Sequence, residues 1–365
     1  MSFNFRFGII SDLHIALPKT IENNPHRFHL VEVSIPALEA ALAHLKTLNL
    51  DFLLLPGDLT QDGEIINHQW LANRLSKLPF PTYVIPGNHD VPNLNATETT
   101  IALKDFPSYY HEYGYQNKQQ LYYSKEILPG VQLIALNSNN FNAEGKQIGC
   151  LDETQICWLE ETLETLEDKL VLVTIHHNII EHFPQQKSHP LGQRYMLYNA
   201  ANLLEILQKH QVKLIFTGHL HVQDIARSQS IYEICTGSLV SYPHPYRVVE
   251  ISKSDRDLQV NVESFKINSV TGWQNLGETS REWMSDRSEL FMSKLLTLPP
   301  LNLSSQEAQK YASQLRYFWS DFAAGDAIFD FPQLPEHLRK YFQSFSAVEE
   351  GEKPALIDNN TTISL

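Results

Sequence analysis

The sequence predicts an α/β protein that carries a helical region at its C-terminal end. Short apolar runs alternate with helix-like segments over the first two thirds of the chain, and this alternation is typical of a layered α/β sheet. After residue 266 three longer helical patterns follow. A chain of 365 residues has room for one large domain or two. We therefore expect a first domain at residues 1–266, a helical region at 267–348 and a loose tail at 349–365.

The strand predictions rest on apolar runs rich in β-branched, aromatic or other large side chains. The runs of the first two thirds are Phe5–Ile10, Phe52–Leu55, Thr82–Ile85, Val131–Leu136, Leu170–Ile175 and Val212–Thr217. Later runs near Ile231–Cys235, Arg247–Ile251 and Leu258–Phe265 have no helices between them. These later strands could therefore be antiparallel additions to the sheet.

The helix predictions rest on apolar residues at three- and four-residue spacing. In the first domain they are Val31–Leu48, Asp152–Leu166, with Asp152 as the N-cap, and Asn199–Lys209. In the C-terminal region they are 278–298, 304–324 and 334–346, where Ser304 and Glu307 fit a capping box. The aromatic and apolar residues of these last helices need a partner to be buried, which is either the first domain or a second subunit. We expect the first domain, where a helix could also border a cleft.

The composition excludes several classes of protein. With 42% hydrophobic residues the chain can build a core. Its 28 Lys and Arg against 42 Asp and Glu disfavour a nucleic-acid or anionic-membrane partner. No apolar run approaches the roughly 18 residues of a membrane span, and the N-terminus does not resemble a signal peptide. Three cysteines without a CxxC pair favour neither a disulfide scaffold nor a zinc–thiolate site. We expect a cytoplasmic protein.

Five polar clusters begin where an apolar run stops. They are Ser11–His14, Pro56–Asp58, Pro86–Asp90, Ile175–His177 and Thr217–His221. In an α/β sheet the carboxyl ends of the strands share one edge, where ligand sites form. Residues that are far apart in the sequence are therefore expected to converge there.

The residue types in these clusters are metal ligands, and their number exceeds what one ion needs. One set could be Asp12, His14, Asp58 and His221; a second could be Asp58, Asn88, His176 and His219. Asp58 would bridge, because a carboxylate has two oxygens for two ions about 3.5–4 Å apart. Nitrogen and oxygen ligands suit Mn, Fe, Co or Zn, and the sequence does not distinguish among these ions. Glycines at 57, 87 and 218 would let the backbone approach the ions.

The order D-x-H, G-D, G-N-H-D, H-H and G-H-x-H over residues 5–251 resembles the calcineurin-like metallophosphoesterases. The resemblance implies a sandwich of two β-sheets flanked by helices, with a dinuclear metal centre. The ligands that it implies are the seven residues assigned above. It also implies that His89, in the G-N-H-D motif, protonates the leaving group or steadies the transition state.

Within that family the chain looks most like the class III cyclic nucleotide phosphodiesterases, through Gly57–Asp62 and the segment 149–159. It departs from their usual pattern at Asn137, where Asp is usual, and at Asn178, where Pro is usual. Gln61 stands where purple acid phosphatases have Tyr, and the Asp-Arg of protein phosphatases is absent there. These departures concern loop shape and substrate rather than the ligands.

The sequence therefore predicts an enzyme that hydrolyses a small-molecule phosphodiester, similar to a cyclic nucleotide, by in-line attack of a metal-bridging hydroxide. The alternatives within the enzyme class are a phosphomonoesterase and a glycerophospho- or phospholipid-headgroup hydrolase. A non-catalytic metal-bound scaffold is disfavoured because all seven ligands are present. The acidic balance also disfavours a nuclease. Exact substrate, metal identity and oligomeric state are not readable from the sequence.

Several other residues could border the site. His177 is expected beside the ligands rather than among them, because neighbouring residues on a strand point to opposite sides. His26 and His29 lie in the loop after the first motif, which could overhang the site. Arg194-Tyr195 and the segment 242–246 could touch a base or a phosphate, although packing within loops is the simpler interpretation.

Overall fold

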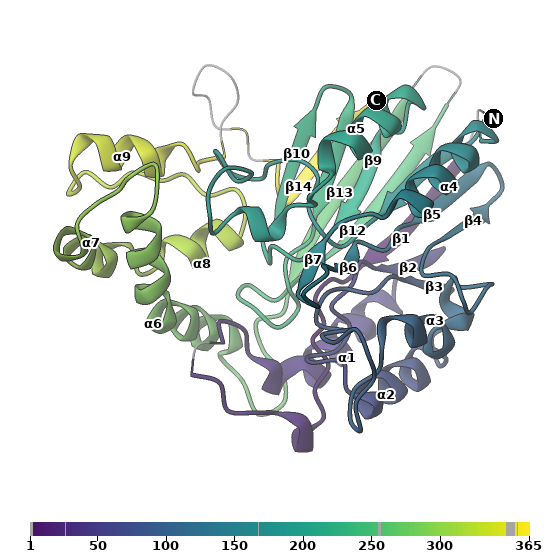
Figure 1. Ribbon diagram of the computed structural model, residues 1–365, viewed down its shortest axis with the longest axis horizontal. Helices are drawn as coiled ribbons and strands as arrows, with labels where there is room; N and C mark the ends of the chain where they lie inside the picture. The colour runs from purple at the N-terminus through teal and green to yellow at the C-terminus, as the bar shows by residue number, and fades with distance from the viewer. Residues whose placement is uncertain (1–2, 26, 167, 255–256, 348–354, 356) are drawn as a thin grey trace.

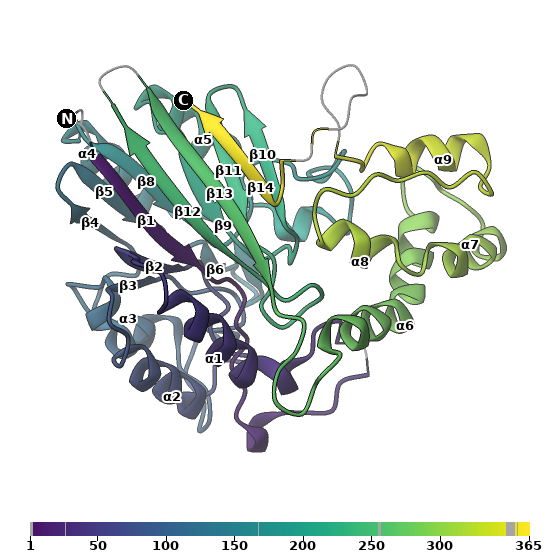
Figure 2. The ribbon, with the colours of Figure 1, turned by 180° about the vertical axis from the view of Figure 1, so that it is seen from behind.

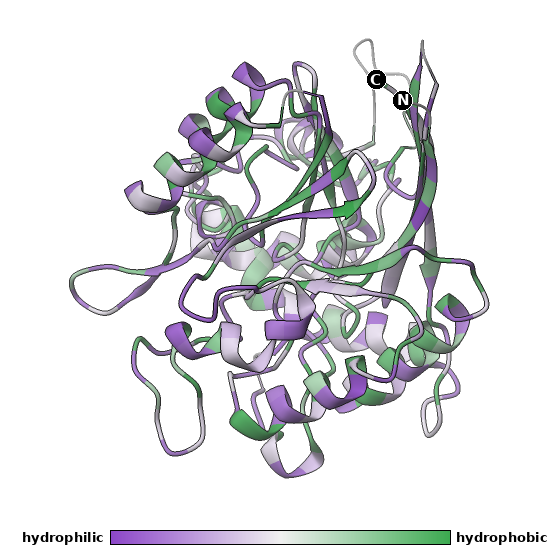
Figure 3. Ribbon diagram, turned by 90° about the vertical axis from the view of Figure 1, so that its right-hand side faces the viewer, coloured by the Kyte–Doolittle hydropathy of each residue, from purple (hydrophilic) through white to green (hydrophobic). Residues whose placement is uncertain are grey.

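The computed structural model describes residues 3–25, 27–166, 168–254, 257–347, 355 and 357–365. Two six-stranded sheets stack against each other and helices cover their outer faces (Figure 1). This arrangement confirms the predicted sandwich with its C-terminal helices. Figure 3 shows helices on both flanks that carry both hydrophilic and hydrophobic residues, as expected of helices with one buried and one exposed face.

The first sheet has the strand order β14-β13-β12-β1-β2-β3. Its strands are β1 (Phe3–Ile9), β2 (Phe52–Leu55), β3 (Thr82–Val84), β12 (Pro245–Lys253), β13 (Leu258–Lys266) and β14 (Asn360–Ser364). Strands β1, β2 and β3 are parallel, so their carboxyl ends lie at one edge, whereas β12, β13 and β14 extend the sheet in antiparallel fashion. Helices α1 (Ser34–Leu45), α2 (Ile65–Leu75) and α3 (Phe106–Tyr109) lie on the side of this sheet that faces away from the second sheet (Figure 2).

The second sheet has the order β10-β11-β9-β8-β5-β4. Its strands are β4 (Tyr123–Leu128), β5 (Val131–Ala135), β8 (Leu170–Thr174), β9 (Leu214–Thr217), β10 (Asp224–Ser228) and β11 (Ile231–Cys235). Helices α4 (Glu153–Glu164) and α5 (Ala200–Lys209) pack on its outer face, and the Asp152 side chain caps α4 as predicted. A short hairpin, β6 (Asn139–Phe141) and β7 (Gln147–Gly149), stands apart from both sheets.

The later strands only partly follow the prediction. Strands β12 and β13 are antiparallel additions, as expected. The expectation was wrong for β11, which runs parallel to β9. The physical reason is the intervening strand β10, which takes the sheet edge and turns back by a tight hairpin, so that β11 enters between β10 and β9 in the direction of β9.

The core between the sheets is aromatic. The ring of Phe7 on β1 stacks on Phe52 of β2 at 4.5 Å and meets Phe216 of β9 edge-on at 5.4 Å. All three side chains are buried. The contact between Phe7 and Phe216 joins the first sheet to the second. It therefore helps to fix the relative position of the strands whose loops carry the polar clusters.

The C-terminal region is helical, with α6 (Leu276–Thr297), α7 (Ser305–Ala312), α8 (Phe318–Ala323) and α9 (Glu336–Gln343). The Ser304–Glu307 capping box is present. The single helix expected at 304–324 is broken by a 3-10 turn at Ser313–Leu315. Leu315 and Phe318, at and after this turn, are both buried in a hydrophobic cluster of the C-terminal helices, which we call the helical cluster. The expected packing on the first domain is observed, because Phe183, Leu220, Val222 and Cys235 belong to the same buried cluster.

The prediction of a loose tail at 349–365 was wrong for its final residues. Residues 360–364 form β14, which pairs with β13 in register from Asn360 opposite Glu263 to Ser364 opposite Gln259. The physical reason is the open edge of β13, whose backbone groups need partners, together with the burial of Ile363 against that sheet. Residues 349–354 and 356 of the predicted tail lie outside the described residues.

Candidate metal centre

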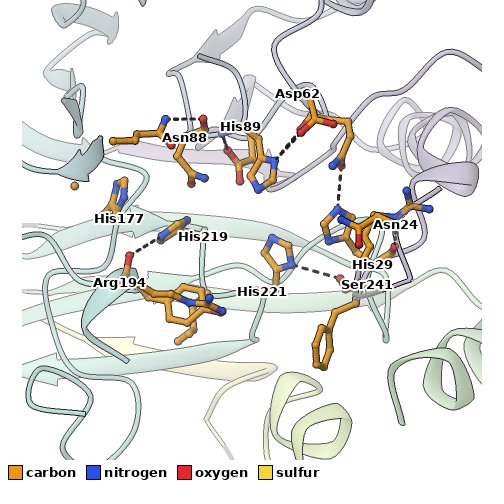
Figure 4. A pocket seen from close by; sticks show the side chains of 18 of the residues that line it. Asn24, His29, Asp62, Asn88, His89, His177, Arg194, His219, His221 and Ser241 are labelled. Atoms are coloured by element: carbon orange, nitrogen blue, oxygen red, sulfur yellow. Dashed lines mark hydrogen bonds and ion pairs between the residues drawn. The ribbon is translucent and has the colours of Figure 1, made fainter. Parts of the chain in front are cut away.

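Loops from both sheets bring all the predicted ligands to one place. Figure 4 shows Asn88 and His89 on one wall of a pocket, facing His219 and His221 on the other. The predicted ligands, each with the strand that it follows, are Asp12 and His14 (β1), Asp58 (β2), Asn88 (β3), His176 (β8), and His219 and His221 (β9). The convergence expected from the carboxyl ends of the strands is therefore observed.

The first group comprises Asp12, His14, Asp58 and His221, whose candidate ligand atoms all lie within 4.8 Å of one another. His221 Nε2 lies 3.2 Å from Asp12 Oδ1, and His14 Nε2 lies 3.7 Å from Asp58 Oδ2. The two imidazole nitrogens of His14 and His221 are 3.2 Å apart. Four donor atoms from three loops thus surround one point, which is the geometry that a cation needs.

The second group comprises Asp58, His176 and His219, again within 4.8 Å. His176 Nε2 lies 3.4 Å from Asp58 Oδ1 and 3.2 Å from Asn88 Oδ1. The Asp58 carboxylate therefore belongs to both groups and turns one oxygen toward each. This is the arrangement expected of a carboxylate shared by two neighbouring cations.

The donor set fits metal ions by three observations. Asp58 Oδ2 is buried and has no hydrogen-bond partner among the described residues, which is costly unless a cation satisfies it. His176 Nδ1 donates to the carbonyl of Pro56 at 2.8 Å, and His219 Nε2 donates to the carbonyl of Arg194 at 3.1 Å. These bonds fix each ring so that its other nitrogen is available as a ligand.

The protonation of the imidazoles agrees with this role, with one exception. Burial and the neighbouring His29 hold the pKa of His14 well below its usual range, and burial and His177 do the same for the pKa of His219. Both rings are therefore neutral, the form that binds metals. Burial also lowers the pKa of His176, but the Asp58 carboxylate outweighs it and raises this pKa to about 9. An ion at that position has to displace a proton from the ring.

The backbone around the ligands is strained. Asp12, His14, Asp58, His219 and His221 all have positive φ, between 44° and 67°, in the left-handed region that non-glycine residues rarely enter. Such strain persists only where the surroundings enforce it, and it concentrates at functional sites. Here it turns several polar side chains from successive loops toward one point.

A glycine lets two of the loops touch. A Cβ atom on Gly87 would lie 2.2 Å from the backbone nitrogen of Asp58, so only glycine permits this approach. The carboxylate of Asp90 joins the same two loops, because it accepts hydrogen bonds from the backbone nitrogens of Leu59, Thr60 and Gly87 at 2.8–3.0 Å. Asp90 is thus a structural member of the G-N-H-D motif.

His89 is anchored on one side only. Its Nδ1 donates to the carbonyl of Gln61 at 2.7 Å, and its backbone nitrogen donates to Asp58 Oδ1 at 2.8 Å. Its Nε2 has no partner among the described residues, and the side chain lines the pocket. Burial lowers the pKa of His89, but the Asp58 carboxylate and the Asp62 carboxylate, 3.7 Å from Nδ1, outweigh it and raise the pKa to about 9. The side chain for which the family resemblance implies a catalytic role therefore lies at the pocket.

Two further histidines line the pocket beside the predicted ligands, and His29 forms a third candidate metal-binding group with His14 and His221. His177 is buried with its Nδ1 2.7 Å from Ser138 Oγ, and its ring lies 4.2 Å from that of His219. It therefore lies beside the ligands, as expected. His29 stacks on His14 at 4.4 Å and contacts Gln61 Oε1 at 2.9 Å through Nε2. His26, the other histidine of that loop, lies outside the described residues.

The groups converge on a pocket of about 1000 Å³. Arg194 and Tyr195 line it, as one of the two interpretations of that segment held. Of the segment 242–246, none lines it, whereas the preceding Ser241 does. Met284 and Phe291 of α6 and Trp319 of α8 also border the pocket, which agrees with the expectation that a C-terminal helix could border the cleft. The aromatic pattern of the C-terminal helices predicted a buried face but not which face of the first domain it covers.

The described helices include none that is both long and apolar enough to pass through a lipid bilayer.

Comparison with known proteins agrees with this geometry. The family described as calcineurin-like phosphoesterase matches residues 5–223, more than half of the chain, so the chain belongs to this family. It is therefore a phosphoric ester hydrolase with candidate metal-binding clusters of Asp and His.

Named relatives are more distant. The chain is 27% identical over 216 residues to a probable cyclic nucleotide phosphodiesterase from Moraxella catarrhalis, covering 54% of this chain and 73% of that protein. It is 29% identical over 219 residues to a probable glycerophosphodiester phosphodiesterase from Arcobacter nitrofigilis, covering 58% and 70% respectively. A dimetal phosphatase from Danio rerio has a similar fold, with a TM-score of 0.55, 16% identity and coverage of 72% of this chain and 96% of that one.

Proposed function

We propose that this enzyme hydrolyses small-molecule phosphodiesters of the cyclic nucleotide type with the help of two divalent metal ions. The observation that carries the proposal is the Asp58 carboxylate, which both candidate clusters share and which has one buried oxygen without a hydrogen-bond partner in the described part of the chain. The similarity to two relatives named as probable phosphodiesterases supports the substrate class.

Asp12, His14 and His221 would hold the first ion, while Asn88, His176 and His219 would hold the second, with Asp58 common to both. When bound, the two ions supply Lewis acidity that activates water and draws charge from the phosphoryl oxygens. His89 holds Nδ1 against the carbonyl of Gln61 and presents Nε2 to the pocket. From there it would give its proton to the leaving oxygen as a general acid.

Two alternatives remain distinct candidates. A glycerophosphodiester or other headgroup diester is favoured by the name of the second relative. A phosphomonoester requires the same ligands and a pocket that accepts a dianion. Specificity therefore depends on the pocket walls rather than on the metal centre.

The test is a substrate panel with protein loaded with Mn²⁺: a cyclic nucleotide, a glycerophosphodiester, a nucleotide monoester, and a chromogenic diester beside its monoester. We expect chelator-sensitive hydrolysis with higher kcat/KM on the diesters. A clear preference for the chromogenic monoester would reject the diester assignment, and a lack of hydrolysis throughout would reject the proposed function. Supplying Fe²⁺, Co²⁺ or Zn²⁺ instead of Mn²⁺ then identifies the ion that supports turnover best.

A further inference from the structure

The C-terminal helices form one wall of the pocket that contains the metal ligands. Met284 and Phe291 on α6 and Trp319 on α8 border the same cavity as Asp58 and His219. Phe28, in the loop after the first motif, completes this group, which we call the aromatic wall: Phe28, Met284, Phe291 and Trp319. Met284, Phe291 and Trp319 lie in the C-terminal region, beyond the family match at residues 5–223.

The aromatic wall is joined directly to the metal centre. Leu220, between the ligands His219 and His221, is buried in the helical cluster that also contains Met284. Its two neighbours belong to the candidate ligand groups, and all three residues line the pocket. On the other side, Phe28 precedes His29, whose ring stacks on His14. A ligand on the wall and a phosphoryl group at the centre thus share one continuous cavity.

The helices also hold the loop that carries Phe28. Trp283 Nε1 on α6 donates a hydrogen bond to the carbonyl of Arg27 at 3.1 Å. The Phe28 ring meets that of Phe291 edge-on, with centroids 6.0 Å apart at 76°. The backbone nitrogen of Gln223, just after the last ligand loop, donates to the carbonyl of Ala323 in α8 at 3.0 Å. Packing and hydrogen bonds with the first domain therefore fix the position of the aromatic wall.

The chemistry of the wall favours a flat aromatic group. Phe28 and Phe291 are only partly buried and the Phe291 ring lies 4.9 Å from Trp319, so ring faces and edges remain for a third ring to pack against. Arg194 adds a guanidinium 4.6 Å above the ring of Tyr195 and has no carboxylate partner among the described residues. A cavity of about 1000 Å³ is also far larger than a phosphate with two small alkyl groups requires.

We propose that the aromatic wall selects phosphodiesters in which one ester group carries a planar aromatic ring, such as an aryl group or a nucleobase. The inference rests on the proposed function, because it names the substrate class for the same metal centre. The C-terminal helices are then a specificity element, and Phe28 and Phe291 are specificity-determining residues.

The test measures binding rather than turnover, with three phosphonates that cannot be hydrolysed at their C–P bond: methyl-, cyclohexyl- and phenylphosphonate. Calorimetric titration of the Mn²⁺-loaded full chain should give a Kd for phenylphosphonate about tenfold below that for methylphosphonate, the gain expected from burying one ring. The cyclohexyl compound should fall between them, because it is apolar but not planar.

Single variants test which residues cause the preference for phenylphosphonate over methylphosphonate. Phe291→Ala and Phe28→Ala, on separate elements, should each reduce the phenyl-to-methyl preference about three- to tenfold, the range of aromatic pair contacts, while the Kd for methylphosphonate stays the same. Phe331→Ala is the matched control, since Phe331 is a partly buried aromatic residue of the same helical cluster that does not line the pocket. It should keep the full preference.

The outcomes separate this inference from the proposed function. If methylphosphonate binds but the phenyl compound binds no better, or if both wall variants keep the preference, the inference is wrong while the proposed function stands. A stronger preference for the cyclohexyl compound would also overturn it, because that result indicates a general apolar pocket. If no phosphonate binds the metal-loaded protein and no ester is hydrolysed, the proposed function itself fails.

Discussion

The backbone nitrogen of His89 donates a 2.8 Å hydrogen bond to Oδ1 of Asp58. The same oxygen lies 3.4 Å from His176, and the other oxygen of Asp58 lies 3.7 Å from His14. One carboxylate thus links the candidate acid to both candidate metal sites. A change at Asp58 should therefore affect the whole centre, whereas changes at single-cluster residues should affect half of it.

The first prediction is that Asp58→Ala loses both ions, whereas Asp12→Ala leaves one site partly occupied. The reason is that Asp12 belongs to the first cluster alone. Elemental analysis of dialysed, Mn²⁺-loaded protein measures the stoichiometry. The matched control is Asp62→Asn, because Asp62 is an exposed carboxylate in the same loop, outside both clusters. Two ions per chain and full activity in Asp58→Ala would show that the dinuclear assignment is wrong.

The second prediction is that His89→Ala lowers kcat by about 10²–10⁴-fold, the usual range for a positioned acid–base group. Metal content should hardly change, because the His89 side chain belongs to neither cluster. The loss should shrink on diesters with a low-pKa leaving group, since such a group needs little protonation. Steady-state kinetics on a series of leaving groups measures this, with the exposed His111→Ala as the control. An equal loss across the series would contradict the role.

The strand ends of the first domain could be predicted because apolar runs and polar clusters alternate in the sequence itself. Asp12, Asp58 and His176 each follow such a run, and topology alone brings them together. The spacing of apolar residues does not predict that the His29 ring stacks on His14, because His29 lies in a loop that has neither helical nor strand periodicity. Its position depends on the contacts of that loop with α6.

The aromatic wall and the last strand are tertiary effects that leave little mark on the sequence. The sequence predicted that a C-terminal helix could border the cleft, but the packed structure is needed to identify Phe291 and Trp319 as residues that border it. Strand β14 has one buried side chain, Ile363, among polar neighbours. Its β-branched residues Thr361, Thr362 and Ile363 favour a strand, but with a single buried side chain its pairing depends on the open edge of β13.

The third prediction tests this last strand. Ile363→Ala should lower the free energy of unfolding by about 2–4 kcal/mol, the cost of truncating a large buried aliphatic side chain. Ile363 is paired opposite Val260 and packs in the main core cluster. Urea unfolding followed by fluorescence measures the change, and the exposed Ser364→Ala on the same strand is the control. Equal stabilities of the two variants would mean that the end of the chain does not pair in solution.

The last prediction concerns a buried ion pair below the ligand loops. Glu233 on β11 accepts hydrogen bonds from the backbone nitrogens of Ile179 and Ile180 at 2.9 and 2.6 Å and from Thr217 Oγ1 at 2.8 Å. His182 Nε2 lies 3.0 Å from the same carboxylate. These contacts hold the segment that follows β8 against β11 and the last residue of β9.

The two groups shift each other's pKa. Burial raises the pKa of Glu233, but the charge of His182 outweighs it and leaves that pKa below the ordinary value of 4.5. Burial lowers the pKa of His182, but Glu233, with Asp224 and Cys235 adding to it, holds that pKa well above 6.5. The stabilising contribution of Glu233 is therefore present above pH 4.5 and is lost as the pH falls through its lowered pKa. That of His182 is present below pH 6.5 and is lost as the pH rises through its raised pKa.

Glu233→Gln should therefore lower the free energy of unfolding by about 3 kcal/mol, the scale of breaking a buried ion pair. This loss should be largest between pH 4.5 and 6.5. At higher pH the wild-type imidazolium also loses its proton, so the difference between wild type and variant should shrink. Urea unfolding of both proteins at pH 5.5 and at pH 9 measures this, with the exposed Glu263→Gln as the control. Asp224 also contacts His182 Nδ1, so Asp224→Asn should show the same pH trend with a smaller amplitude, because its side chain is partly exposed. A cost of Glu233→Gln that did not change with pH would show that the carboxylate acts only as a hydrogen-bond acceptor and that His182 is neutral in the folded protein.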